Sequence, residues 1–144
     1  MFPTGRFGPS ASEEQIRHAE NALGVALPEQ LRKLYLECDG FEEPLIRACY
    51  LFPLEAERGL ESLVGTTQFW WRDWKSIQAE AIDFAPFVFF GKSGGEDYWA
   101  IRLSSPNEII AYHHNMGYGW ESLGHSILDV YRRDYEETEA LDED

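Results

Sequence analysis

Two apolar runs between Phe87 and Leu103 constrain the fold more than any other stretch of this chain. Phe87–Phe90 and Asp97–Leu103 are rich in the aromatic and β-branched residues that suit the half-buried surface of a β-sheet. The connection between them, Gly91–Glu96, contains three glycines, which reverse a chain direction at low steric cost. The pattern predicts a β-hairpin with a connection longer than the tightest turns.

Further strands are predicted on either side of this hairpin. Ile109–His113 follows a turn at 104–108 and extends the hairpin to an antiparallel meander. Leu51–Leu54 suits a short edge strand, the kind of strand that tolerates Pro53 most easily. The glycine- and aromatic-rich residues 115–124 are predicted to form a loop.

Helix signals mark the N-terminal part of the chain. Ser12 begins a helix with Gln15 at the capping-box distance, and Gly24 ends it. A second helix begins at Pro28 and ends at Asp39–Gly40. The short link between the two helices predicts a helical hairpin.

Two more helices are expected later in the chain, one over about residues 67–81 and one capped by Ser126. Trp70 and Trp74 share the apolar stripe of the first of these helices, whereas Trp71 lies off the stripe and is expected to be more exposed.

The sequence therefore predicts one α+β domain over residues 12–135. In the predicted domain a mostly antiparallel sheet, with the meander at its centre, is flanked by the N-terminal helical hairpin, the mid-chain helix and the C-terminal helix. Residues 1–11 are expected to form an irregular arm and residues 136–144 a frayed acidic tail.

Composition narrows the classes of partner. The formal net charge of −14 disfavours binding to nucleic-acid phosphates or to an anionic membrane, and favours a basic partner. No apolar stretch has the length of a membrane span, and the first ten residues lack the pattern of a signal peptide. Cys38 and Cys49 lack the spacing of a zinc site or disulfide framework, which indicates reduced thiols in a cytoplasmic protein.

An ordered series of short motifs resembles the SUKH superfamily, which includes the yeast cell-wall assembly regulator and many bacterial immunity proteins. The corner Leu23–Glu29, with the helix after it and the Asp39–Gly40 turn, resembles the family's N-terminal signature. The segments that match later family elements, in the expected order, are Leu51–Leu54, Phe89–Gly91, Gly94–Tyr98, Ile110–His114 and Ser126–Tyr131.

This resemblance covers roughly residues 12–135 and departs from the family pattern at two positions. Asp39 replaces the usual asparagine, and Glu96 stands where the family often has a glycine or another small residue. The resemblance implies an α+β fold and, for bacterial members, neutralisation of toxins, many of them nucleases, by binding. The family shares no catalytic residue set, so the resemblance assigns no catalytic residue.

Catalytic and metal-binding patterns receive little support from the residues. His113 and His114 could bind a metal with Glu96 and Asp97, but adjacent residues on a strand point to opposite faces of the sheet. The loop Gly91–Glu96 lacks the spacing of a phosphate-binding loop. We therefore expect no cofactor, no metal and no catalytic residue.

The binding residues are predicted from residue type, because Trp, Tyr and Arg are the favoured anchors of protein interfaces. The candidates are Trp71, Arg72, Tyr118 and Trp120, together with the acidic residues Glu96 and Asp97. The sequence thus predicts a non-enzymatic protein-binding domain, an immunity protein that neutralises a basic toxin by binding it. The alternatives are a regulator or scaffold without a toxin partner and a small metal-dependent hydrolase, and the oligomeric state is left open.

Overall fold

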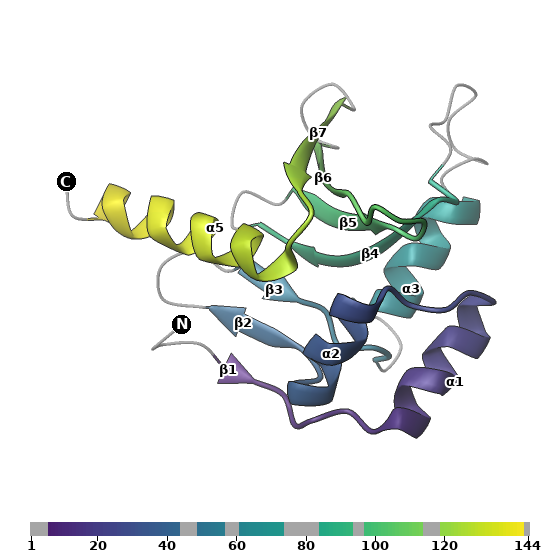
Figure 1. Ribbon diagram of the computed structural model, residues 1–144. Helices are drawn as coiled ribbons and strands as arrows, with labels where there is room; N and C mark the ends of the chain where they lie inside the picture. Colours follow the sequence, from purple (N-terminus) through teal and green to yellow (C-terminus); the bar gives the residue numbers. More distant parts are fainter. Residues whose placement is uncertain are drawn as a thin grey trace.

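The computed structural model describes residues 6–43, 49–56, 61–73, 84–93, 97–113 and 119–142. Within these residues, seven strands form one antiparallel sheet in which the order in space follows the order in the chain (Figure 1). The strands are β1 (Arg6–Phe7), β2 (Phe41–Glu43), β3 (Cys49–Leu51), β4 (Phe87–Lys92), β5 (Tyr98–Arg102), β6 (Ile109–His113) and β7 (Gly119–Gly124). The helical elements are α1 (Glu13–Leu23), α2 (Glu29–Glu37), α3 (Leu63–Gln68), the π-helical segment η1 (Phe69–Asp73) and α5 (Ile127–Asp142).

The sheet has a different apolar core on each face, because successive side chains on a strand point to opposite sides. We call the first side the α5 face, since α1, α2 and α5 pack there against sheet residues that include Leu51, Val88, Phe90, Trp99, Ile101, Ile109 and Ala111. We call the second side the Trp70 face, where Trp70 and Phe84 pack against Phe87, Phe89, Ala100, Ile110 and Tyr112. The predicted α+β class, with helices flanking an antiparallel sheet, is confirmed.

The predicted cap of α1 is present in full. The Gln15 backbone N–H donates to Ser12 Oγ at 3.1 Å, and the Ser12 backbone N–H donates to Gln15 Oε1 at 2.7 Å. Gly24 ends the helix at φ +77°, a conformation that favours glycine. Pro28 precedes α2 as its N-cap rather than forming its first residue.

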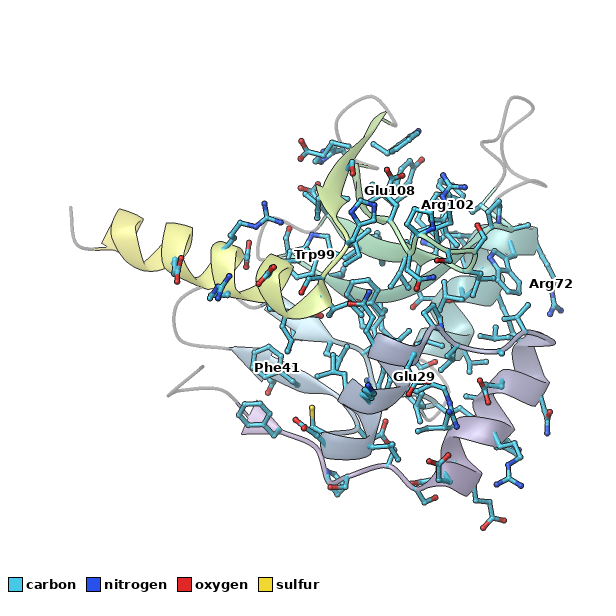
Figure 2. The ribbon with its side chains drawn as sticks, viewed as in Figure 1. Glu29, Phe41, Arg72, Trp99, Arg102 and Glu108 are labelled. Atoms are coloured by element: carbon cyan, nitrogen blue, oxygen red, sulfur yellow. The ribbon has the colours of Figure 1, made fainter. Side chains whose placement is uncertain are left out.

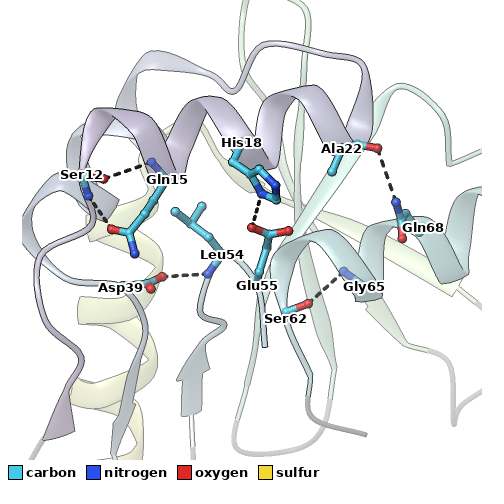
Figure 3. A network of polar contacts seen from close by, with 10 residues as sticks. All are labelled: Ser12, Gln15, His18, Ala22, Asp39, Leu54, Glu55, Ser62, Gly65 and Gln68. Carbon is cyan, nitrogen blue, oxygen red and sulfur yellow. Dashed lines mark hydrogen bonds and ion pairs between the residues drawn. The ribbon is translucent and has the colours of Figure 1, made fainter. Parts of the chain in front are cut away.

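Polar contacts join α1 to the segment that leads into α3 (Figure 3). His18 Nδ1 lies 2.6 Å from Glu55 Oε2, and the Gln68 side chain donates to the Ala22 carbonyl at 3.4 Å. Nearby, Asp39 Oδ1 accepts from the Leu54 backbone N–H at 2.8 Å. These contacts hold the helical hairpin against α3 and against the segment between β3 and α3.

Several strands differ from the expectation. Arg6–Phe7 form β1 within the expected arm, and Gly119–Gly124 form β7 where a loop was predicted. The predicted edge strand at Leu51–Leu54 is wrong, because β3 ends at Leu51 and pairs with β2 on one side and β4 on the other. Pro53 follows the strand and so removes no hydrogen bond from the sheet.

Two helices also differ. The mid-chain helix begins at Leu63, four residues before the predicted start, and the π-helical segment η1 follows it. The rest of the predicted helix, including Trp74, lies outside the described residues. α5 continues to Asp142 through most of the expected tail, and Figure 1 shows its C-terminal half extending past the strands. None of the helices in the described part of the chain is long and apolar enough to cross a membrane.

Candidate protein-binding surfaces

One row of residues crosses β2 to β7 on the Trp70 face. The strand registers place its members directly opposite one another in the order Glu42, Tyr50, Lys92, Tyr98, Tyr112 and Trp120. Directly opposite residues share one face of a sheet. The row is therefore charged toward the β1 edge and aromatic toward the β7 edge.

Trp70 covers only part of this row. Its ring centroid lies 5.5 Å from that of Tyr98 and 5.1 Å from that of Tyr112, and Tyr112 is fully buried. Trp120, the next residue of the row, lies on the edge strand β7 and remains 49% exposed. A half-exposed tryptophan on a sheet edge is a ready contact for a protein partner.

A histidine bridge joins β6 and β7 on the α5 face. His113 Nδ1 lies 2.9 Å from Asp97 Oδ1, and His113 Nε2 lies 3.2 Å from Glu121 Oε1. The hydrogen bond that His113 donates to Asp97 raises the pKa of His113, the negative charges of Asp97 and Glu121 raise it further, and partial burial opposes them. The two carboxylates hold the imidazole ring between them.

This arrangement differs from a metal site. Each carboxylate contacts a different ring nitrogen, so the two carboxylates lie on either side of the imidazole and do not converge with it on one point. Within the described ranges, no group of three or more His, Cys, Asp or Glu side chains is arranged to hold a metal ion.

A mainly apolar groove lies between α2 and α5. It has a volume of about 410 Å³ and is lined by Phe7, Leu34, Glu37, Cys38, Phe41, Leu51, Leu128 and Tyr131. An adjoining hollow of about 310 Å³ shares Leu34, Glu37 and Leu128 with it. We call the two together the α2–α5 groove. Its rim residues Phe7 and Leu128 are 59% and 54% exposed.

A family model described as the SMI1/KNR4 family (SUKH-1) matches residues 10–131. The chain belongs to this family. The match confirms the resemblance seen in the ordered motifs, and its range agrees with the sheet and helices described above. A search of the curated proteins finds no match to the chain.

In this SUKH-1 protein the predicted binding residues do not gather into one patch. Trp120 is half-exposed on the Trp70 face, whereas Asp97 contacts His113 on the other face. Arg72 is exposed on η1, and Figure 2 shows it pointing away from the rest of the molecule. Glu96 and Tyr118 lie outside the described residues.

Trp71 is more exposed than the buried Trp70, as its place off the apolar stripe predicts, but it is still half-buried. Its indole N–H donates to the Phe87 carbonyl at 2.7 Å. It also packs against the cores on both faces of the sheet. In this SUKH-1 fold Trp71 therefore fixes η1 to β4 and offers a partner only part of its ring.

Sequence reasoning missed the α2–α5 groove. Its residues are ordinary apolar types, and Phe7 lay within a segment expected to be irregular. One signal was present: Leu128 lies beside the buried stripe of Ile127, Val130 and Tyr131, so an inward-facing position was already taken on either side of it. A single exposed leucine is normal on a protein surface, so this signal could not locate the groove without the structure.

Proposed function

We propose that this SUKH-1 protein acts by binding another protein, and that it is an immunity protein that neutralises a basic toxin. The observation that carries the proposal is the family match over residues 10–131, since the family includes toxin-immunity proteins. In this proposal the protein blocks its partner sterically and breaks no bond itself.

Charge supports a basic partner. The chain carries 26 acidic and 12 basic residues, a formal net charge of −14. Opposite charge on two proteins speeds their encounter, and salt weakens this effect because exposed charges are screened over about 8–10 Å. Rapid capture suits a protein that must reach a toxin before the toxin reaches its target.

Exposed interface-type residues supply further support. Trp120 and Arg72 are open to solvent, and both residue types are enriched among the anchors of protein interfaces. They remain proposed contacts, together with Trp71, Glu96, Asp97 and Tyr118.

Co-expression tests the proposal. Toxin domains encoded by genes found near this one in its genome are each expressed in a host cell with and without the chain, and each purified pair is titrated by calorimetry. We expect the chain to restore growth and to bind with a Kd of about 10 nM or lower, with an association rate that falls as salt rises. Glu14→Lys, on the exposed side of α1, serves as a control for nonspecific charge effects. Absence of both protection and binding would refute the immunity role.

A further inference from the structure

We propose that the α2–α5 groove is the docking site for a basic amphipathic segment of the partner protein. The apolar side chains of this segment fill the groove, and its lysines or arginines face the acidic C-terminal half of α5. This inference rests on the proposed function, because it names the part of a basic partner that the chain would hold.

The apolar part of the groove is built from three distant parts of the chain. Phe7 of β1 stacks on Phe41 of β2 with ring centroids 5.1 Å apart, and Phe41 meets Tyr131 of α5 edge-on at 5.8 Å. Leu128, one turn before Tyr131, also lines the groove. Phe7 and Leu128 are each more than half exposed, and two large apolar side chains in one groove gain from a partner that covers them.

Glu37 gives the groove a negative potential where its two hollows meet. It is exposed and lies at the C-terminal end of α2, where the helix dipole is also negative. Cys38 lies next to it on the groove wall. Burial raises the pKa of its thiol, and the negative charges of Glu37 and Asp39 raise it further. A cationic side chain is favoured beside Glu37.

The acidic character continues along α5. After Arg133 the chain has seven acidic residues and no lysine or arginine. Earlier in the helix the bases have partners: Arg132 Nη2 lies 2.7 Å from Asp129 Oδ1, and Arg133 donates to the Leu123 carbonyl.

One end of the groove gives the bound segment a direction. Lys33 lines that end, beside Gln30 and Ser126. Gln30 bonds both the His125 carbonyl and the Ile127 backbone N–H at 2.8 Å, which closes the groove between the start of α5 and α2. The basic end of the segment therefore lies toward Glu37 and the C-terminus of α5, and its less basic end toward Lys33.

A second copy of this chain suits the groove less well. Self-association would bring two acidic α5 segments together, and like charges on facing surfaces oppose association. A basic partner gains from the same charges. Charge complementarity therefore selects a basic segment over a homodimer.

Fluorescence anisotropy with synthetic peptides tests the inference on the full chain. The probe is a labelled 18-residue amphipathic helix of leucine and lysine, slightly longer than the 16-residue α5 when helical. A peptide of the same composition with its leucines dispersed around the helix controls for nonspecific charge attraction. We expect the amphipathic peptide to bind at least about tenfold more tightly than the dispersed one.

Matched variants locate the binding. Leu128→Ser and Phe7→Ser should each weaken binding of the amphipathic peptide about tenfold, whereas Leu36→Ser, which removes an exposed leucine of α2 outside the groove, should change it less than about twofold. Glu37→Lys, which reverses the charge on the groove wall, should weaken binding several-fold and flatten its salt dependence, with Glu14→Lys as its control. Thermal melting confirms that each variant is folded.

Three results would overturn the inference: equal affinity for the two peptides, unchanged binding in Leu128→Ser, or a loss that appears in Trp120→Ala instead. Each leaves the co-expression test of immunity unaffected, because a toxin can still bind at another surface. Conversely, the groove can bind the basic peptide even if the neighbouring toxin proves not to be the partner. Sedimentation of the free chain should show a monomer; a dimer lost in Leu128→Ser would assign the groove to self-association.

Discussion

Replacement of Gly91 by alanine tests how α5 is fastened to the sheet. The Tyr131 hydroxyl donates to the Tyr50 carbonyl at 2.6 Å, and this hydrogen bond passes directly over Gly91. An added Cβ at Gly91 would lie well inside van der Waals contact of both the hydroxyl and the carbonyl oxygen. The need for glycine is therefore steric.

The free-energy loss follows from what must move. If the Tyr131 side chain withdraws, its buried hydroxyl loses a hydrogen bond that contributes about 1 kcal/mol. The Tyr50 carbonyl belongs to the backbone of β3, so the paired strands β3 and β4 must also separate, and overpacking of this kind costs about 1–3 kcal/mol. We expect Gly91→Ala to lower the free energy of unfolding by about 2–4 kcal/mol in total. For a domain of this size the melting temperature should fall by about 6–12 °C.

Urea denaturation of four proteins measures the effect: wild type, Gly91→Ala, Tyr131→Phe and the double variant. Tyr131→Phe should lose about 1 kcal/mol. The free energy of unfolding of the double variant should remain well below that of Tyr131→Phe, because the Tyr50 carbonyl oxygen still clashes with the new methyl group. Gly24→Ala is the control, since its added Cβ meets no atom within 4 Å and only its φ of +77° opposes alanine, at about 1 kcal/mol. A loss below about 0.5 kcal/mol in Gly91→Ala would refute the reasoning.

Three other substitutions have expected outcomes. The raised pKa of His113 means that its protonated form stabilises the fold fully below its ordinary pKa of 6.5, and that this contribution fades as the pH rises through the higher folded-state pKa. Asp97→Asn should therefore lower the pKa of His113 measured by NMR, and it should lower the free energy of unfolding more at about pH 5.5 than at about pH 8.5. Equal losses of stability at the two pH values would contradict the histidine bridge. Ser12→Ala should cost about 1 kcal/mol in urea denaturation by removing the cap of α1, and an unchanged midpoint would contradict the capping box. Trp70→Ala should cost about 3–5 kcal/mol because the ring is 4% exposed, whereas Trp120→Ala should cost about 1 kcal/mol or less; similar losses would show that Trp120 is part of the core.

The elements that could be predicted from the sequence are those whose sequence signals lie within a few neighbouring residues. Ser12 and Gln15 cap a helix wherever an apolar stripe follows, and the glycine-rich connection after Phe90 joins two strong β-forming runs. These signals act locally, so they survive in the folded domain. The overall α+β class followed from their order.

Short strands could not be predicted in the same way. β1 has two residues and β2 has three, and each exists because a neighbouring strand pairs with it. β7 begins and ends with glycine, which resembles a loop when read alone. Strand formation depends on cross-strand packing more than on intrinsic preference, so these elements become visible only with the sheet in place.

The prediction of the binding residues depended on the helical period assumed around Trp71. The expected exposure of Trp71 assumed 3.6 residues per turn, but the chain is π-helical from Phe69 to Asp73, with hydrogen bonds to the fifth residue along. This change rotates the later side chains, and the Trp71 indole reaches the Phe87 carbonyl. Residue type alone therefore could not separate the half-buried Trp71 from the half-exposed Trp120.

The strand order also explains why the groove forms at the β1 edge. Since the sheet follows the chain, β7 ends at the edge opposite β1, and α5 must return across the α5 face toward the first strands. Gln30 fixes the start of α5 to α2, and the Tyr131 hydroxyl fixes its next turn over β3. Tyr131 is the last residue of α5 that is buried among those whose side chains are described. The hydrogen bond between Tyr131 and the Tyr50 carbonyl, which forms only because residue 91 is glycine, therefore fixes one wall of the groove. A substitution at Gly91 should change the width of the groove without altering any residue that lines it.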